Sequence, residues 1–394
     1  MNVLVVLTYY RPHTSGLTIY AERLAEAMVK RGHNVTVLTS QFEKNLPREE
    51  VRNGVRIVRA PVLFRISKGV IMPSFGWLAT KLVNESDFIH LHLPQFDAAG
   101  VALRGRLMNK PTVITYHCDL IMPPGVLSRL ANAAVLVMNE MAGWFTHRIV
   151  TYTQDYADNS KYLSRFTKKL KIIQPPVVLP ETTEEKVRLF SDQHNPDRCS
   201  PVIGMAARFA TEKGVEVLMN ALKIVVEKYP RAMVQFAGPY QNIIGEEEYF
   251  ARLEPQLRQF EKAGNWKFLG TLDPETMAAF YRNIDVLVMS SLNSTEAFGL
   301  VQIEAMINGK PCIASNLPGV RQPVKLHDMG LVTPIGDSEA LAKAIMEVVE
   351  HREKYERDPK PIRARYLPES VAIAYEELYQ EMIEELHIAP AALQ

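Results

Sequence analysis

The chain has 394 residues and a formal net charge of +1 at pH 7, from 45 basic and 44 acidic side chains. This length exceeds what one hydrophobic core usually organises, so we expect two domains. A hydrophobic content of 47% and a charged content of 23% are typical of a globular protein. The near-zero net charge argues against a protein that binds nucleic acid with its whole surface.

Cysteine usage and the first residues indicate the compartment. The three cysteines, Cys118, Cys199 and Cys312, form no Cys-x-x-Cys pair, which favours reduced thiols in the cytoplasm. Residues 3–7 already show the pattern of a buried strand, so we expect no signal peptide. No run of eighteen or more purely apolar residues follows, which argues against a membrane-spanning helix.

The first half of the chain alternates apolar strands with amphipathic helices. A strand at 3–7, a loop, a helix that ends at Gly32 and a strand at 35–38 form half of a nucleotide-binding fold. No Gly-x-Gly-x-x-Gly follows the first strand, which argues against a dinucleotide site. Further strands are predicted at 55–58, 88–91, 112–116, 148–150 and 170–173.

Prolines and a polar run mark the predicted domain boundary. Pro175, Pro176 and Pro180 interrupt the alternation. Residues 181–200 contain few apolar side chains, and we interpret them as a linker or an exposed insertion. We therefore expect domains at 1–178 and 179–367, followed by a final helix at about 368–386.

The second half repeats the alternation of strands and helices. Its strands are predicted at 202–205, 233–236, 267–269, 285–289, 312–314 and 330–332. The fold class is therefore α/β, with two doubly wound Rossmann-like domains that face one another across a cleft. Ligands of such sheets bind beyond the carboxyl ends of the strands, and the motifs below all lie at such ends.

The stretch 290–311 places two acids around the start of a helix. A strand runs into a polar loop that holds Glu296, and the helix that contains Glu304 begins after Gly299. Glu304 lies ~7–8 Å along the helix axis from Gly299, and the free N–H groups at the helix start favour an anion. A diphosphate flanked by a sugar and a ribose fits this arrangement. The alternative is a solvated loop acid and a surface helix acid.

Arg208 and Lys213 lie where another strand ends and a helix begins. Two cations five residues apart at this junction can neutralise a diphosphate. The alternative is a pair of surface cations, although the helix dipole disfavours cations at a helix start.

Three residues of the first half are candidates for the same cleft. His117 and Asp119 directly follow a buried strand, where a histidine faces the cleft and an acid can orient it or bind an acceptor hydroxyl. Gly16 begins the first helix, where a phosphate or sugar can approach its N–H. The alternatives are a structural histidine and a glycine that only caps its helix.

Motifs for metals and for other chemistry are absent from the sequence. It contains no Asp-x-Asp, no His/Cys cluster with zinc spacing, no Gly-x-Ser-x-Gly and no Walker lysine loop. We therefore expect no metal and no cofactor, with negative charge handled by side-chain cations and helix dipoles.

Taken together and in chain order, these motifs resemble the retaining glycosyltransferases of family four with the GT-B fold, the glycogen-synthase-like and mannosyltransferase-like group. The resemblance covers nearly the whole chain, up to residues 334–345, which are similar to the family's Pro-x-Gly-Asp-x-x-x-Leu-Ala ending. It implies a hexosyltransferase that moves a hexose from a nucleotide diphosphate sugar to a hydroxyl acceptor with retention. It also implies that the final helix crosses back onto the first domain.

The resemblance implies roles for the charged residues of the second domain. Arg208 and Lys213 match the family's pair that holds the donor diphosphate and stabilises it as the leaving group. Glu296 matches the first acid of the family's Glu-x7-Glu motif, which contacts the donor sugar. Glu304 matches the second acid, which binds the ribose hydroxyls.

The remaining matches are uncharged positions and one histidine. Phe298, Gly299 and Leu300 match residues that supply backbone contacts near the sugar and the phosphates. His117 matches a histidine that reaches the donor sugar near the reacting centre. Gly16 matches the second glycine of the family's Gly-Gly loop.

The chain departs from the family pattern at three places. Ser15 replaces the first glycine of the Gly-Gly loop, and Pro175-Pro176-Val177 replaces the usual Pro-Asn-Gly. Residues 317–321 replace a Gly-Gly-x-Pro-Glu segment, so no acid is carried over there.

Other functions stay open. A GT-B-fold sugar-nucleotide epimerase would share the two domains and the diphosphate site but would need no acceptor. A nicotinamide dehydrogenase is disfavoured by the missing glycine fingerprint, and a non-catalytic binding protein would show donor affinity without transfer. UDP- and GDP-hexoses both fit as donors.

A basic segment raises the question of membrane contact. Six cations fall in one segment of the first domain, namely Arg48, Arg52, Arg56, Arg59, Arg65 and Lys68. One interpretation of this segment is a solvated basic face. The alternative is peripheral contact with the inner membrane face and a lipid-linked acceptor, which members of the resembled family often use.

Overall fold

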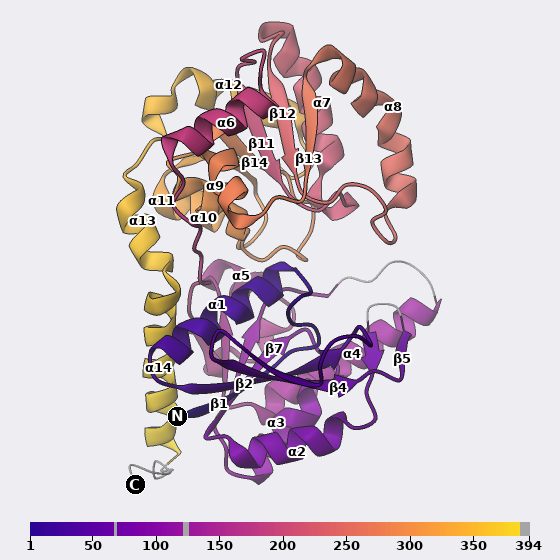
Figure 1. Ribbon diagram of the computed structural model, residues 1–394, viewed down its shortest axis with the longest axis vertical. Coiled ribbons are helices and arrows are strands. Elements are labelled where there is room, and N and C mark those ends of the chain that lie inside the picture. The colour runs from indigo at the N-terminus through magenta and orange to yellow at the C-terminus, as the bar shows by residue number, and fades with distance from the viewer. Residues whose placement is uncertain (67–68, 121–125, 387–394) are drawn as a thin grey trace. The chain divides into compact units, whose positions relative to one another are not determined.

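The computed structural model describes residues 1–66, 69–120 and 126–386. The chain divides into two compact units (Figure 1). Unit 1 comprises Met1–Pro176 together with the chain from Tyr366 onward, and unit 2 comprises Val177–Arg365. The sequence placed the boundary two residues later, after residue 178. Each unit is a largely parallel sheet with helices packed against it, which confirms the predicted pair of Rossmann-like α/β domains.

The sheet of unit 1 has the strand order β10-β9-β8-β7-β1-β2-β4-β3. Its strands pair in parallel except for β3, a charged edge strand that runs antiparallel to β4 and that the apolar pattern did not predict. The order reverses between β1 and β7, and ligands of such sheets bind at that switch point. The strands are β1 (Asn2–Val6), β2 (Asn34–Gln41), β3 (Glu49–Arg52), β4 (Val55–Pro61), β7 (Phe88–Leu93), β8 (Thr112–Tyr116), β9 (Arg148–Thr151) and β10 (Leu170–Ile172), with a separate hairpin of β5 (Phe64–Ile66) and β6 (Gly69–Ile71).

The helices of unit 1 include the last helix of the chain, α14, which packs on the first helix, α1. Arg31, the C-cap of α1, donates two hydrogen bonds of 2.7 Å to Glu376 of α14. Inside the unit, the Tyr20 and Tyr375 hydroxyls of the same two helices are 2.7 Å apart. The helices are α1 (Gly16–Lys30), α2 (Phe75–Glu85), α3 (Ala98–Leu107), α4 (Val126–Phe145), α5 (Gln154–Asn159) and α14 (Pro368–Glu385).

The sheet of unit 2 has the strand order β13-β12-β11-β14-β15-β16, and its strands pair in parallel. The order reverses between β11 and β14. The loops that follow these two strands therefore flank the switch point of this unit. The strands are β11 (Val202–Ala206), β12 (Met233–Ala237), β13 (Trp266–Gly270), β14 (Val286–Met289), β15 (Cys312–Ser315) and β16 (Gly330–Thr333).

The helices of unit 2 follow the predicted alternation after each strand. Those of the core, such as α7, bury a continuous apolar face against the sheet. The helices are α6 (Glu184–His194), α7 (Val215–Lys228), α8 (Glu247–Ala263), α9 (Pro274–Asn283), α10 (Leu300–Met306), α11 (Gln322–His327), α12 (Ser338–Glu350) and α13 (Pro359–Tyr366), the last of which leads into unit 1.

The interpretation of residues 181–200 as a linker or insertion is wrong, because they contain α6. The Thr183 hydroxyl caps this helix by accepting a hydrogen bond from the Lys186 N–H, and its first turn is acidic, as the helix dipole favours. Phe190 is its buried anchor and packs near Phe280 of α9. One buried side chain is too weak a periodic signal to predict a helix.

None of the helices in the described ranges is long and apolar enough to cross a membrane.

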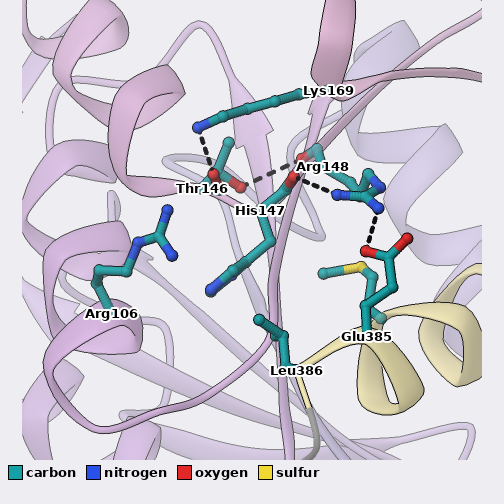
Figure 2. Close-up of a pocket in the computed structure, with 8 residues that line it drawn as sticks. Arg106, Thr146, His147, Arg148, Lys169, Glu385 and Leu386 are labelled. Atoms are coloured by element: carbon teal, nitrogen blue, oxygen red, sulfur yellow. Dashed lines mark hydrogen bonds and ion pairs between the residues drawn. The ribbon is translucent and has the colours of Figure 1, made fainter.

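A pocket of about 240 Å³ in unit 1 lies where β9 begins (Figure 2). It therefore sits at the amino-terminal edge of the sheet, opposite the edge where ligands bind in such folds. Its Lys169 donates hydrogen bonds to three backbone carbonyls around the end of α4, namely those of Gly143 at 2.9 Å, Trp144 at 2.8 Å and Thr146 at 2.7 Å. The lysine thus caps the C-terminus of α4.

Replacing this cap should destabilise unit 1. Lys169→Met leaves three carbonyls without their donor, and we expect a loss of roughly 1–3 kcal/mol in the free energy of unfolding. The neighbouring Lys168 is exposed, so Lys168→Met is the matched control and should change little. Urea denaturation followed by circular dichroism measures both, and equal stabilities of the two variants would contradict the capping role.

Candidate active site

Arg208 and Lys213 lie in the loop after β11, on one side of the unit 2 switch point. Arg208 follows the last residue of β11 by two positions, and Lys213 ends a short 3-10 helix, Thr211–Lys213. Gly214 then turns the chain into α7 with φ of 66°. Glycine adopts this left-handed conformation at little cost, which explains the residue at this position.

The loops after β11 and β14 are held against one another by hydrogen bonds to backbone carbonyls. The Ser290 hydroxyl donates to the carbonyls of Gly214 at 2.9 Å and Lys213 at 3.1 Å. The Leu292 N–H donates to the carbonyl of Glu212 at 2.8 Å. A Cβ at position 214 would lie 2.1 Å from the Ser290 carbonyl oxygen, so glycine is also required by the close approach of the loops.

This contact brings Lys213 and Glu296 together. The Lys213 Nζ lies 2.6 Å from a Glu296 carboxylate oxygen, and the two side chains are 22% and 20% exposed. Burial alone would lower the pKa of Lys213, but the adjacent Glu296 carboxylate outweighs it, so the pKa is raised above its usual value. Lys213 is therefore fully charged at neutral pH, and the sequence-predicted cation and acid form one ion pair.

Arg208 has its own carboxylate partner in the same loop. Its guanidinium pairs with Glu212, four residues further along the chain. Together with the Lys213–Glu296 pair, this gives two cations and two carboxylates, so the charges of the loops compensate one another. A phosphate dianion that binds here would compete with Glu212 and Glu296 for the two cations.

The start of α10 lies directly after this cluster. Gly299 caps the helix with φ of 84°, and a Cβ there would lie 2.3 Å from the Met289 sulfur. Among the described residues, the N–H groups of Leu300 and Val301 have no hydrogen-bond acceptor. The preceding Phe298 is buried, so it anchors the loop while the helix start keeps its free donors.

Glu304, the second predicted acid, is on α10. The Tyr281 hydroxyl of α9 donates to its carboxylate at 3.0 Å. This bond fixes the direction of one carboxylate oxygen of Glu304. Asn308 closes the helix by donating to the backbone carbonyl of Glu304 at 2.8 Å.

Gly16 is the first residue of α1, which follows β1 at the unit 1 switch point. The Ser15 hydroxyl caps this helix by accepting a hydrogen bond from the Thr18 N–H at 3.2 Å. Ser15 thus has a structural use at the position where the family has a glycine. Nothing lies within 4 Å of a Cβ built at Gly16, so packing of the described chain does not require a glycine there.

His117 directly follows β8 and is almost fully buried, with 7% of its surface exposed. Its Nε2 is hydrogen-bonded to His92 Nδ1 at 2.8 Å, and its Nδ1 to the Tyr152 hydroxyl. Burial, and secondarily the neighbouring His92, lowers the pKa of His117 well below its usual range, so the ring is neutral at pH 7. The predicted contact of His117 with a donor sugar stays a prediction.

Asp119 does not orient His117 in this structure. Its carboxylate accepts hydrogen bonds from the Tyr116 hydroxyl at 2.9 Å and the Ser160 hydroxyl at 2.7 Å. The orienting half of the Asp119 prediction is therefore corrected, because both ring nitrogens of His117 are bonded to other residues. A role for Asp119 in binding an acceptor stays a prediction.

Several residues of the site were missed from the sequence. Glu212 carried a usable signal, since an acid four residues after Arg208 suits a local ion pair. His90 and His92 also carried a usable signal. They lie at alternate positions of a buried strand, so their side chains share one face of the sheet. Ser290 and Tyr281 carried none, since their partners are distant in sequence.

No group of three or more His, Cys, Asp or Glu side chains that could hold a metal ion occurs among residues 1–66, 69–120 and 126–386.

Known proteins resemble both units. A model described as Glycosyltransferase Family 4 matches residues 14–179, and one described as Glycosyl transferases group 1 matches residues 187–361. The 2-deoxystreptamine N-acetyl-D-glucosaminyltransferase of Streptomyces fradiae is 28% identical over 87% of this chain and 84% of its own. The phosphatidyl-myo-inositol mannosyltransferase of Mycolicibacterium smegmatis is 23% identical over 89% and 85%.

Solved structures agree on the fold. The crystal structure of HepE from Anabaena in complex with UDP superposes with a TM-score of 0.75 at 20% sequence identity, over 97% of this chain and all of that one.

The close approach at Gly214 can be tested with a matched pair of glycines. Gly214 and Gly264 both have positive φ, 66° and 79°, but only a Cβ at 214 meets another atom. Gly264→Ala should therefore cost only the left-handed strain, about 1–2 kcal/mol. Gly214→Ala must also push the two loops apart, so we expect a larger loss in urea denaturation and weaker binding of UDP or GDP by calorimetry. Equal effects of the two substitutions would refute the constraint.

Proposed function

The chain belongs to the group 1 glycosyltransferases with the GT-B fold, an assignment with which glycosyltransferase family 4 is consistent, and we propose that it moves a hexose from a UDP- or GDP-hexose to a hydroxyl acceptor with retention of configuration. The observation that carries the proposal is the cluster of Arg208, Lys213 and Glu296 at the unit 2 switch point. A diphosphate needs positive charge as it leaves, and this cluster supplies it where such folds bind their ligands.

Departure of the donor diphosphate is assigned to unit 2. Arg208 and Lys213 neutralise the charge that grows on the leaving group. The free N–H groups of Leu300 and Val301 add donors at the start of α10. The contact between the two loops keeps Lys213 close to the start of α10, and the diphosphate competes with Glu212 and Glu296 for the two cations.

The two acids are assigned to the hydroxyls on either side of the diphosphate. Glu296 binds the hydroxyls of the transferred sugar, and its pairing with Lys213 links sugar binding to diphosphate binding. Glu304 binds the ribose hydroxyls, with its carboxylate oriented by Tyr281. Phe298, together with the residues at the start of α10, contributes backbone contacts.

The groups of unit 1 are assigned to the sugar and the acceptor. His117 lies near the reacting carbon, Gly16 allows close approach of the donor, and Asp119 binds the acceptor. Retention is proposed to proceed by substitution on the front face, in which the leaving diphosphate takes the proton of the acceptor hydroxyl. The bond from the anomeric carbon to the diphosphate breaks as the bond to the acceptor oxygen forms.

The acceptor is proposed only as a hydroxyl-bearing molecule. The two relatives named above carry 2-deoxystreptamine and phosphatidyl-myo-inositol in their names, so soluble and lipid-linked acceptors both belong in the test panel.

The basic segment gives limited support for membrane contact, because two of its cations are paired within the protein. Arg59 is buried and pairs with Glu50, and Arg56 pairs with Glu49. Lys68 lies outside the described residues. We propose a cytoplasmic location.

The epimerase alternative is not favoured, since the named relatives are sugar transferases. A screen of UDP- and GDP-hexoses, reading the released nucleotide diphosphate with and without acceptors, tests the assignment. We expect release that depends on the acceptor, and a product whose anomeric proton coupling matches the α or β configuration of the donor. Inversion would overturn retention, and donor isomerisation without acceptor would favour the epimerase.

Arg208 should be the most sensitive single cation. Arg208→Ala removes one preorganised charge from the leaving group, so kcat should fall by roughly 10²–10³-fold. Arg258 of α8 forms a similar exposed pair with Glu254 at i,i+4, and Arg258→Ala is the matched control. Steady-state kinetics measures both, and an unchanged kcat in a folded Arg208→Ala protein would remove this role.

A further inference from the structure

Three histidines are buried in unit 1 at the carboxyl-terminal part of its sheet. His90 and His92 share one face of β7, and His117 follows the neighbouring strand β8. Their exposed fractions are 0%, 1% and 7%. The His90 and His92 rings stack with centroids 4.5 Å apart, and the His92 and His117 rings with centroids 5.1 Å apart. A stack of three buried imidazoles is costly unless its nitrogens are satisfied.

A row of hydrogen bonds crosses the ends of three adjacent strands. His92 near the end of β7, His117 after β8 and Tyr152 after β9 are bonded in that order. The Tyr20 ring of α1 meets the His117 ring edge-to-face at 5.0 Å and fills the space beside it. The two hydrogen bonds therefore restrain the ring nitrogens of His117, and the Tyr20 ring restrains the position of its imidazole.

The bond between the two imidazoles locks their tautomers together. One proton lies between His92 Nδ1 and His117 Nε2, because one nitrogen must donate and the other accept. If His117 donates, its Nδ1 must accept from the Tyr152 hydroxyl. If His92 donates, His117 carries its proton on Nδ1 and gives it to Tyr152. Each of these two hydrogen-bond patterns allows one tautomer of His117. To change its tautomer, both hydrogen bonds of His117 must reverse their direction.

The surroundings keep these rings uncharged. Burial lowers the pKa of His92 to about 3, and burial together with the other two histidines lowers that of His90 well below its usual range. The titratable groups bonded to the cluster or facing it are phenols, from Tyr20 on α1, Tyr152 after β9, and Tyr375 and Tyr379 on α14. No carboxylate among the described residues is bonded to any of the three rings.

We propose that His92 and Tyr152 are positioning residues for His117 in the glycosyl transfer proposed above. They hold its imidazole in one ring plane and one tautomer at the carboxyl edge of the sheet, so that it meets the donor sugar without reorientation. The His92 Nε2 is buried without a hydrogen-bond partner in the described structure. An orphaned nitrogen is an uncompensated cost, which a purely structural core position would avoid with an apolar residue.

A second hydrogen-bonded chain supplies the matched control. It runs from the Tyr379 hydroxyl to His90 at 3.0 Å, from His90 to the Thr115 hydroxyl at 2.7 Å, and on to Tyr375 at 2.6 Å. Tyr379 is as buried as the residues around His117, but it is bonded to His90 and not to His117. Tyr379→Phe therefore removes a buried hydroxyl from the same cluster and leaves both bonds of His117 in place.

The test uses the full chain with three further substitutions. His92→Phe keeps an aromatic ring for stacking but removes the bond to His117, and Tyr152→Phe removes only the hydroxyl. His92→Asn is the rescue variant, since its amide places a donor or acceptor near the former Nδ1. Thermal unfolding establishes that each variant is folded. Nitrogen-15 spectra of the histidine rings report the tautomer of His117 without any need for activity.

We expect the wild-type His117 to show one protonated and one unprotonated ring nitrogen, and His92→Phe and Tyr152→Phe to shift both signals towards an average of the two tautomers. With donor and acceptor, kcat should fall by about 10–100-fold in these two variants, the loss typical of a slightly misplaced active-site group, while KM changes little. His92→Asn should recover most of the kcat, and Tyr379→Phe should match the wild type in both measurements.

Two results would overturn the proposal. One is an unchanged His117 spectrum in both His92→Phe and Tyr152→Phe. The other is an equal loss of kcat in Tyr379→Phe, which would indicate a general effect of the buried cluster. Failure of the proposed function is distinguishable, because a wild-type protein that transfers no hexose from any donor would still give the histidine spectra.

Discussion

The ion pair between Lys213 and Glu296 is the interaction on which the candidate site of unit 2 depends. It joins the loops that follow β11 and β14, the two strands at which the sheet order reverses. The Ser290 hydroxyl donates to the Gly214 carbonyl beside this pair, and the two loops lie closer there than a side chain at position 214 would allow. Removing either partner would leave a partly buried charge without compensation, so the pair links the stability of the loops to their chemistry.

The residues predicted for the site differ in charge between the two units. Unit 2 gathers charged groups that neutralise one another, as in the pairs of Arg208 with Glu212 and Lys213 with Glu296. Unit 1 gathers neutral rings and hydroxyls, and His117 has both ring nitrogens bonded inside the protein. Unit 2 thus has charge that a charged ligand can compete for, whereas the polar atoms of the His117 ring are already satisfied within unit 1.

The sequence predicted those parts of the structure that are local. Alternating apolar strands and amphipathic helices identified both sheets, and the motifs around Arg208 and Glu296 fell at strand ends because parallel strands expose their carboxyl ends at one edge. What it missed depends on contacts between distant segments. The partners of Glu304 and His117 come from other strands or helices, and α6 is anchored by a single buried phenylalanine, Phe190. No pattern within one segment encodes such pairings.

The place of α14 in unit 1 has a consequence for biosynthesis. Unit 2 is continuous in sequence, from Val177 to Arg365, whereas unit 1 needs the residues from Tyr366 onward. Tyr375 and Tyr379 of α14 are bonded to Thr115 and His90, so these inner partners are synthesised only after the whole of unit 2. The first half of the nascent chain therefore waits, with its polar interior incomplete, until unit 2 and α14 have been synthesised.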